Sequence, residues 1–171
     1  MIKYLADMVH LMSFVFLLAR ILKSKSTLGI SSKTQELYLI VFILRYMDLF
    51  MYFVSFYNTL MKIAFIGITS FTIHLLLRKK PYCSSYNRTK DSFKHFEIIL
   101  PVGAVLTLFI HSKFTVWEMC WSYSLWIESM AIFPQLDMLR KMREAESLTS
   151  NYVAALGIYR LLYVFHWYCD E

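Results

Sequence analysis

The sequence predicts an all-α integral membrane protein folded as a single helical bundle. Hydrophobic residues make up 58% of the chain, and its mean hydropathy of +0.48 is well above that of an ordinary soluble domain. The apolar residues are gathered into long segments, and the basic residues are concentrated in every second connection between them. At 171 residues, with no stretch that has the composition of a linker, the chain fits one transmembrane domain.

Six apolar segments account for most of the chain. Because about 20 helical residues cross the ~30 Å hydrocarbon core of a bilayer, most of these segments are long enough to span it. The third and fourth segments are short and would have to stand nearly upright. In chain order the segments are about Tyr4–Leu22, Leu37–Tyr57, Met61–Leu77, Glu97–His111, Val116–Leu136 and Tyr152–Tyr168.

The first segment is predicted to be a retained helix. A cleaved signal peptide has a basic n-region before its apolar stretch and a small-residue cleavage site after it. This segment has neither, and it contains Asp7, His10 and Arg20. We therefore expect it to belong to the folded bundle.

The basic residues predict how the chain is oriented, because cytoplasmic loops of membrane proteins carry an excess of Lys and Arg. Twelve basic residues lie in the connections after the first, third and fifth segments, against three at the opposite ends. We expect these connections to be cytoplasmic and the N-terminus to be lumenal or exterior, so that the glycosylation sequon at Asn87 stays unmodified. The twelve are Lys23, Lys25, Lys33, Arg78, Lys79, Lys80, Arg88, Lys90, Lys94, Arg140, Lys141 and Arg143, and the three are Lys3, Lys62 and Lys113.

Ionised side chains also lie inside the apolar segments. On translocon scales a charge at the middle of a membrane helix costs about 2.5–3.5 kcal/mol, so charges retained there usually face a polar cavity. Arg45 and Asp48 are three residues apart in one segment and would share a helix face. With Glu118, Glu128 and Arg160 they predict a charged cavity inside the bundle. The alternative is that Arg45 and Asp48 form an ion pair that only locks helices together.

Several other classes of function have little support. Cys83, Cys120 and Cys169 show no CxxC or Cys/His spacing, so neither a disulfide framework nor a metal site is predicted, and no cofactor is expected. No nucleophile–base pair, phosphate-binding loop or metalloprotease motif occurs, which argues against an enzyme. The net charge of +6 does not indicate nucleic acid, because the basic residues flank apolar segments.

Five short strings are spread over the chain in a fixed order. They are GISSKTQ (29–35), RYMDLF (45–50), SFYNT (55–59), ESMAIFPQL (128–136) and ALGIYRLLY (155–163). Together they resemble the ER lumen protein-retaining receptors, the family that binds the Lys-Asp-Glu-Leu or His-Asp-Glu-Leu retrieval signal. One string alone would be weak support, whereas five in register are specific. The resemblance runs from Asp7 to about Trp167.

The resemblance implies a seven-helix fold related to the PQ-loop and SWEET transporters, with two three-helix bundles joined by a fourth helix. On this pattern the first bundle covers about 4–77, the linker helix about 97–111, and an incomplete second bundle about 116–168. The sequence provides six of the seven expected transmembrane helices. We therefore interpret the chain as C-terminally truncated relative to the family, without the seventh helix and without the cytoplasmic tail that recruits the vesicle coat.

The resemblance also implies a set of signal-binding residues. Arg45 would bind the C-terminal carboxylate region of the signal, a task suited to the planar guanidinium fork. Asp48 in the same string would line the pocket. Glu118 and Trp121, one turn apart on one helix face, would receive the basic or imidazole residue at the start of the signal.

Further pocket residues follow from the same comparison. Tyr159 and Tyr163 match two pocket tyrosines of the family. Lys3 stands where the family usually has arginine, which would lose bidentate geometry. Asp170 stands three residues after Trp167, where the family has an arginine, and this anion should repel an acidic ligand.

A histidine in the first segment matches a family residue tied to pH-dependent binding. Histidine has an unperturbed pKa near 6.5, so its charge can change between a near-neutral ER and a more acidic Golgi. We expect His10 to act in pH sensing, with Glu128 as a neighbour that could share its proton. The plain alternative is a hydrogen-bonded structural histidine.

The implied function is retrieval of escaped ER-resident proteins from the Golgi, by a multi-pass protein of both membranes with a lumenal N-terminus. Its partners would be the C-terminal tetrapeptide, membrane lipid and, in a full-length form, the vesicle coat. Two alternatives remain open: a small-solute transporter of the SWEET or PQ-loop type, and a truncated homologue that binds no signal. Charged groups at Lys3, Arg45, Asp48 and Glu118 favour a zwitterionic peptide over a sugar.

Overall fold

The structure of the chain is a computed structural model that describes residues 2–50, 53, 55–111, 113–142 and 147–170. Within this range the side chains of residues 2–4, 50, 147–149, 167 and 169–170 are not described. All regular elements of the described part are helices. They are α1 (Ile2–Ser24), α2 (Ser32–Arg45), the short 3₁₀ helix η1 (Met47–Phe50), α3 (Phe56–Leu77), α4 (Tyr82–Ser85), α5 (His95–Phe109), α6 (Val116–Met130), α7 (Phe133–Met142) and α8 (Ser147–Asp170).

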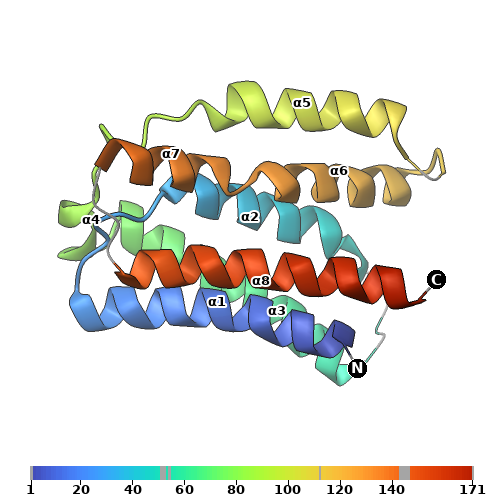
Figure 1. Cartoon of the computed structure of the whole chain (residues 1–171), viewed down its shortest axis with the longest axis horizontal. Coiled ribbons are helices and arrows are strands. Elements are labelled where there is room, and N and C mark those ends of the chain that lie inside the picture. Colours follow the sequence, from blue (N-terminus) through green and yellow to red (C-terminus); the bar gives the residue numbers. More distant parts are fainter. Residues whose placement is uncertain (1, 51–52, 54, 112, 143–146, 171) are drawn as a thin grey trace.

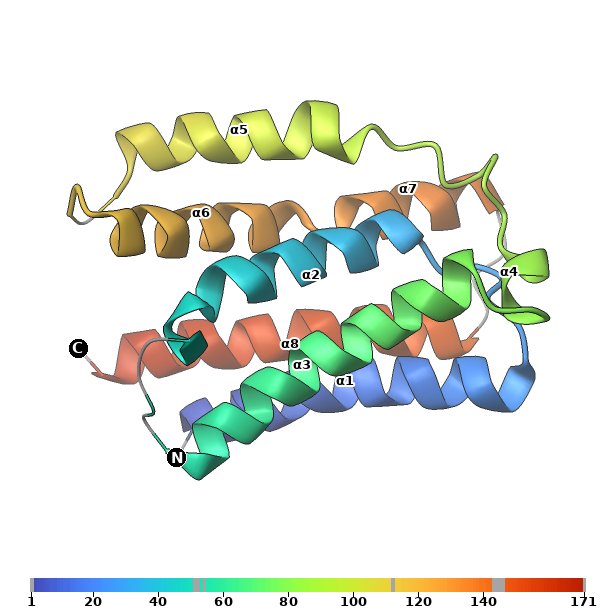
Figure 2. The ribbon, with the colours of Figure 1, turned by 180° about the vertical axis from the view of Figure 1, so that it is seen from behind.

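The long helices run roughly side by side in a layered bundle (Figure 1). α5 is outermost and packs on α6, and α6 and α7 follow one another almost end to end. On the other side α1 and α8 pack along each other, and α3 crosses them obliquely, in front of them in the view of Figure 2. α2 contacts α3, α6 and α7, so it joins the two sides of the bundle.

Two of the six predicted segments are interrupted in the structure. The prediction of one helix over Leu37–Tyr57 was wrong, because α2 ends at Arg45, the 3₁₀ helix η1 follows, and α3 begins at Phe56. The break lies at Tyr46, whose φ of −103° and ψ of 22° leave the helical region. The second interrupted segment, Val116–Leu136, divides into α6 and α7, with Pro134 as the second residue of α7, in the first turn where proline is tolerated.

Helix starts follow the local capping signals of the sequence. Ser31 caps α2 by accepting a hydrogen bond from the backbone N–H of Thr34. Ser55 caps α3 and Thr115 caps α6 in the same way. Such caps satisfy backbone donors that have no partner inside the helix, and they set where α2 and α3 enter the bundle.

Two of the described helices, over Leu5–Ser24 and Phe56–Leu77, are long and apolar enough to cross a membrane by themselves. α2 has 14 residues and α5 has 15, which corresponds to about 21–23 Å at 1.5 Å per residue. Each of these two helices is therefore shorter than the ~30 Å hydrocarbon core of a bilayer.

Polar side chains join the connections at the end of the bundle that holds the start of α2. Gln135 of α7 accepts from the Ser31 backbone N–H at 2.9 Å and donates to the Gly29 carbonyl at 2.7 Å. The buried Asp91 carboxylate accepts from the Ser31 hydroxyl at 2.8 Å and the Ser32 backbone N–H at 2.9 Å, a position at a helix start that favours an anion. Tyr86 also donates to Asp91 at 2.5 Å, and burial together with this carboxylate raises the pKa of the Tyr86 phenol above its usual range.

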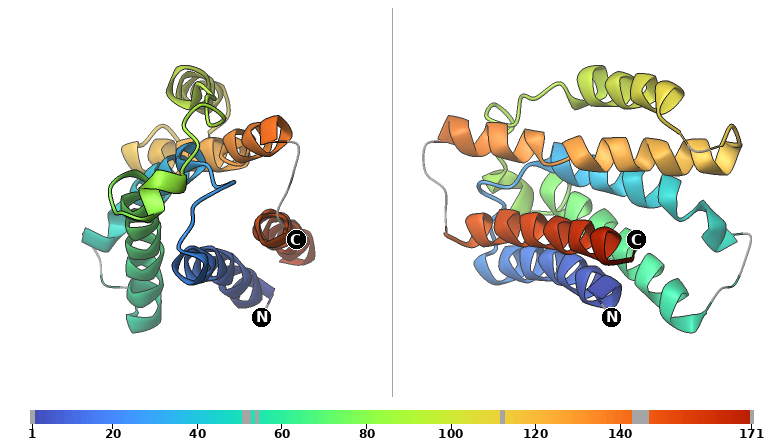
Figure 3. Two further views of the ribbon diagram at one scale, coloured as in Figure 1. Left: turned by 90° about the vertical axis from the view of Figure 1, so that its left-hand side faces the viewer. Right: turned by 45° about the vertical axis from the view of Figure 1, so that its right-hand side comes forward.

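An aromatic core lies between α1, α2 and α3, beside the charged site. The rings of Phe14 and Tyr38 meet edge to face with centroids 5.2 Å apart, and those of Phe42 and Phe65 lie 4.9 Å apart. Phe14, Tyr38 and Phe42 are fully buried, and Phe65 is nearly so. The left view of Figure 3 looks roughly along the helices and shows α1 and α8 on one side of the bundle and α2 and α6 on the other.

Candidate functional site: a charged cavity inside the bundle

A cavity of about 800 Å³ opens among α1, α2, α3, α6 and α8. This volume is in the range of ligand pockets. Its lining combines aromatic and apolar side chains with ionisable ones. The ionisable side chains at its wall are Asp7, His10, Arg45, Lys62, Glu128, Arg160 and His166, with the phenols of Tyr46, Tyr57, Tyr159 and Tyr163.

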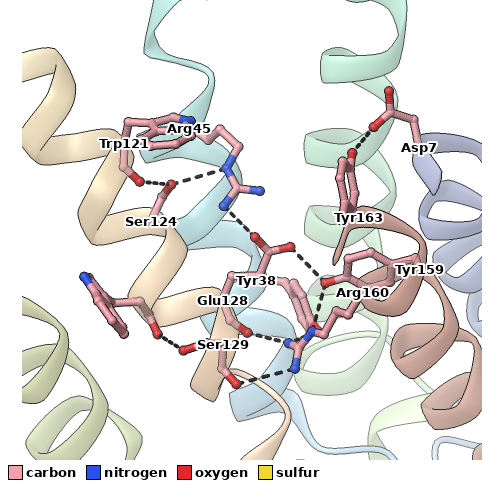
Figure 4. Close-up of polar contacts among 11 residues, drawn as sticks. Asp7, Tyr38, Arg45, Trp121, Ser124, Glu128, Ser129, Tyr159, Arg160 and Tyr163 are labelled. Carbon is pink, nitrogen blue, oxygen red and sulfur yellow. Dashed lines mark hydrogen bonds and ion pairs between the residues drawn. The ribbon is translucent and has the colours of Figure 1, made fainter. Parts of the chain in front are cut away.

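Glu128 of α6 lies at the centre of the polar contacts (Figure 4). Its Oε2 is 2.5 Å from Nη2 of Arg45, and its Oε1 accepts a hydrogen bond from the Tyr159 hydroxyl at 2.8 Å. Glu128 is 8% exposed, so water weakens its electrostatic interactions with Arg45 and Tyr159 only slightly. Helices α2, α6 and α8 thus meet at one carboxylate.

The Arg45 guanidinium is also held from its other side. Its Nε donates to the Ser124 hydroxyl at 3.3 Å, and that hydroxyl donates to the Trp121 carbonyl at 2.7 Å. Arg45 is the last residue of α2, where a cation complements the negative end of the helix dipole. The guanidinium is therefore fixed at the cavity wall with its fork directed at a carboxylate.

Arg160 of α8 binds the end of α6. Its Nη2 donates to the Glu128 carbonyl at 2.5 Å and to the Tyr38 hydroxyl at 3.2 Å, and Nη1 donates to the Ser129 carbonyl at 3.4 Å. Nε donates to the Tyr159 hydroxyl at 3.3 Å. Last-turn carbonyls of a helix have no partner within it, so Arg160 both completes α6 and joins it to α8.

His10 of α1 lies deep in the cavity and is only 4% exposed. Its ring stacks on that of Tyr159 with centroids 3.8 Å apart and planes 10° apart. The Phe42 and Phe65 rings lie 5.8 and 5.0 Å away. His10 Nε2 has no hydrogen-bond partner among the described residues, which leaves a polar atom at the wall available to a ligand or to water.

A further contact joins the two ends of the chain. The Tyr163 hydroxyl of α8 donates to the Asp7 carboxylate of α1, and both residues line the cavity. Tyr159 and Tyr163 lie on successive turns of α8. The Tyr159 hydroxyl donates to Glu128, and the Tyr163 hydroxyl donates to Asp7. The α8 helix thus supplies phenolic donors to carboxylates on α6 and α1.

The expected pairing of Arg45 with Asp48 on one helix face was wrong. α2 ends at Arg45, so the i,i+3 geometry of a helix does not apply across the break. Arg45 pairs with Glu128, while Asp48 of η1 pairs with Lys62 of α3, whose Nζ lies 2.6 Å from Asp48 Oδ2. Both charges are paired, each with a residue from a different helix.

Most of the predicted site residues meet at the cavity. Its wall includes His10, Arg45, Trp121, Glu128, Tyr159 and Tyr163. Asp48 and Glu118 are outside the lining: Asp48 faces Lys62, and Glu118 lies in the first turn of α6, where its backbone N–H is capped by Thr115. The side chains of Lys3 and Asp170 fall outside the described residues.

Two further residues of the site could not be assigned from sequence. Lys62 was counted only as a basic residue near a membrane surface, and Asp7 only as a mark of a retained helix. Arg160, which was predicted to face the charged cavity, lines it. The available signal was an ion inside an apolar segment, which indicates burial but not the partner. No group of three metal-binding side chains occurs in the part of the chain that the structure describes.

Comparison with known proteins gives one consistent family. The family model described as ER lumen protein retaining receptor matches residues 26–170. The chain is 46% identical to an ER lumen protein-retaining receptor of Plasmodium falciparum, over 96% of this chain and 75% of that protein. It is 45% identical to ER lumen protein-retaining receptor B of Arabidopsis thaliana, over 94% of this chain and 74% of that protein. A receptor of the same name from Drosophila melanogaster is 41% identical, over 96% and 76%.

Proposed function

Because this chain belongs to the ER lumen protein-retaining receptor family, we propose that its cavity binds the C-terminal Lys/His-Asp-Glu-Leu retrieval signal of escaped ER proteins. The receptor would take the signal in the Golgi membrane and return it to the ER. In this proposal the ligand is an acidic peptide with a free C-terminal carboxylate, and membrane lipid surrounds the bundle.

One observation carries the proposal: Arg45 already holds a carboxylate at the cavity wall. Glu128 Oε2 lies 2.5 Å from its guanidinium, and Ser124 fixes the opposite edge. A guanidinium oriented in this way suits a ligand carboxylate presented from the cavity in place of Glu128. Trp121 and Leu125 add apolar wall nearby, as a leucine-ended peptide requires.

The pH-dependent binding implied by the resemblance is supported by where His10 lies. The groups around it are Tyr159 and Arg160 of α8, Arg45 and Tyr38 of α2, and Glu128 of α6. Gaining a proton on His10 or Glu128 makes the cavity more positive, which favours an acidic ligand. Binding is therefore proposed to strengthen as pH falls from near neutral.

The same proposal includes the orientation of the chain in the membrane, the recruitment of a vesicle coat, and the likeness to SWEET and PQ-loop transporters. The order of α1–α3, then α5, then the interrupted segment α6–α7 and α8 suits one three-helix group, a linker helix and an incomplete second group. The clustered basic residues of the α3–α5 connection favour a lumenal N-terminus. Cycling to the ER would need a vesicle coat as cytoplasmic partner. The charged cavity favours a peptide receptor over a sugar transporter.

The test is direct binding of labelled peptides to membranes that contain this chain. Peptides ending in Lys-Asp-Glu-Leu and His-Asp-Glu-Leu are measured at about pH 5.5 and 7.4, with C-terminally amidated peptides as the matched control. The proposal expects saturable binding that is stronger at the lower pH and lost on amidation. Absence of binding by either free-acid peptide at both pH values would overturn it.

A further inference from the structure

Five basic residues lie at the end of the bundle where α4 is labelled in Figure 1. Two of them stand at the end of α1 and three directly follow α3, and all five are exposed. Because α1 and α3 carry the two described spans that are apolar enough to cross a membrane alone, these cations lie where the chain leaves the hydrocarbon core, at the depth of the lipid headgroups. We call them the basic corner: Lys23, Lys25, Arg78, Lys79 and Lys80.

Hydrogen bonds hold the two basic segments side by side. The Thr27 hydroxyl donates to the Tyr82 carbonyl at 2.8 Å, and the Thr27 backbone N–H donates to the Ser85 hydroxyl at 2.9 Å. Thr27 is fully buried in this contact. Lys25 and Lys80 each lie two residues before it, a stretch of chain that spans no more than about 7 Å. The cations that follow α1 and α3 are therefore assembled into one surface.

The basic corner has no compensating anion within the described residues. None of its five side chains forms an ion pair or a hydrogen bond there. Like charges that stand close together repel one another, so a bound anion would stabilise this surface. The described acidic side chains at this end of the bundle have partners elsewhere: Glu36 with His95, Glu97 with Lys94, Asp137 with Lys141, and the buried Asp91 with Ser31 and Ser32.

Lys25 keeps its charge in a backbone conformation that suits other residues better. It directly follows the last residue of α1, and its φ of 53° lies in the left-handed region. Glycine and asparagine adopt this conformation more readily than lysine, and glycine is the usual residue just after a helix. A lysine at this position supports a binding role for its charge, and asparagine can replace it without backbone strain.

The phosphate groups of a lipid headgroup fit the chemistry of this surface. A cluster of four to eight Lys or Arg at the end of a membrane helix is typical of sites for anionic lipids. A headgroup with several phosphates can contact cations of both segments at once, and the exposed Leu28 beside Thr27 offers apolar surface to the acyl chains. A lipid is already at the depth of these cations, whereas an acidic protein would have to reach them at the membrane surface.

We propose that the basic corner is a binding site for the phosphorylated headgroup of an anionic membrane lipid, and that polyphosphorylated inositol lipids bind there more tightly than singly charged lipids. Thr27 and Ser85 act by positioning: they hold the two basic segments together and do not contact the headgroup. None of the five basic residues lines the charged cavity, so this site is separate from the one proposed to bind the retrieval signal.

The experiment measures binding of fluorescent lipids to the purified chain in neutral detergent, without signal peptide. The lipids are phosphatidylinositol bisphosphate, phosphatidylserine and phosphatidylcholine, and soluble inositol phosphate serves as the competitor that lacks acyl chains. We expect saturable binding in this order of decreasing affinity, weakened by added salt. Equal affinities for the first and the third lipid would overturn the proposal, and full displacement by an equal concentration of inositol phosphate would overturn the lipid as its ligand.

Substitutions of the cations test the residues of the site. Lys25→Asn is expected to weaken binding of phosphatidylinositol bisphosphate about fivefold, and Lys79→Gln/Lys80→Gln about tenfold or more. Lys79→Arg/Lys80→Arg should retain binding. Lys113→Asn is the matched control for Lys25→Asn, because Lys113 is exposed and lies in the α5–α6 connection. Unchanged affinity in both neutralised variants, or an equal loss in Lys113→Asn, would overturn the assignment.

One further variant separates an assembled site from charge alone. Thr27→Val/Ser85→Ala removes the hydrogen bonds between the two segments and keeps all five cations. It should lose much of the preference for phosphatidylinositol bisphosphate over phosphatidylserine, and the same preference as in the unmodified chain would overturn the positioning role. Circular dichroism checks that this variant is folded. Lys25→Asn, which changes no buried side chain, keeps the proposal testable if it is not.

Discussion

Arg45 Nη2 and Glu128 Oε2 lie 2.5 Å apart across the interface of α2 and α6, so the cation best placed to receive a ligand carboxylate is already neutralised by the protein. The same Glu128 carboxylate accepts from Tyr159 through its other oxygen. A ligand carboxylate at Arg45 therefore has to compete with an internal one, and removing the charge of Glu128 should favour the ligand.

Arg45→Lys is expected to weaken binding of the free-acid signal peptide by about tenfold or more, since lysine keeps the charge but loses the fork and the bond to Ser124. Equilibrium binding of labelled peptide to membranes measures this. Arg140→Lys, on the exposed part of α7, is the control. Equal affinities of free-acid and amidated peptides for the unmodified chain would show that Arg45 has another role.

Glu128→Gln is expected to reduce the ratio of peptide binding at about pH 5.5 to that at pH 7.4. Glutamine keeps an acceptor for Tyr159 but removes the carboxylate that the ligand must displace, so less proton uptake accompanies binding. The measurement is the pH profile of peptide affinity. An unchanged ratio would place the acid dependence elsewhere in the cavity, with His10 as the next residue to test.

Asn87 is expected to remain unglycosylated when the chain is synthesised in the presence of microsomes. It lies in the basic α3–α5 connection, which the distribution of Lys and Arg assigns to the cytoplasm. A sequon in a tag placed before Met1 should be modified in the same reaction and serves as the positive control. A glycan on Asn87 with none on the tag would reverse the orientation and the side from which ligand enters.

Gly103→Leu is expected to destabilise the bundle by about 1–3 kcal/mol, the usual cost of overpacking. Even a Cβ at Gly103 of α5 would lie 3.1 Å from the Tyr123 ring and 3.4 Å from Ile127 of α6. Gly67→Leu on α3 is the matched control, because nothing lies within 4 Å of the corresponding Cβ. Thermal unfolding in detergent should separate the two variants, and equal midpoints would contradict the close α5–α6 contact.

Hydropathy located the helices well but did not locate the breaks within them. All six apolar segments correspond to helices, yet the chain stays apolar through Tyr46 and through Ala131–Ile132, where α2 and α6 end. These ends are set by contacts from elsewhere, such as the Arg160 bonds to the last carbonyls of α6. Local signals carry no information on a partner about 30 residues away.

The site residues that were predicted best are those whose positions did not depend on an uninterrupted helix. Arg45, Glu128 and Tyr159 were expected at one cavity, and the structure brings them together. Asp48 was misplaced because its position was derived by helical spacing across a break. Lys62 was missed because its partner lies 14 residues earlier, across the break and the turn into α3, at a spacing that no periodicity predicts.

The hydrogen bonds of Gln135 to Gly29 and Ser31 can form only after α7 has been synthesised, so they form late in folding. The two sides of this contact are 104 residues or more apart in the chain, so the ribosome makes α7 roughly 5–20 s after the α1–α2 turn. During that interval the turn, on the side predicted to be cytoplasmic, has to satisfy its N–H and carbonyl with water. When α7 is made, the amide side chain of Gln135 replaces that water. The α1–α2 turn therefore loses its bound water late in biosynthesis, although its residues are among the first to be made.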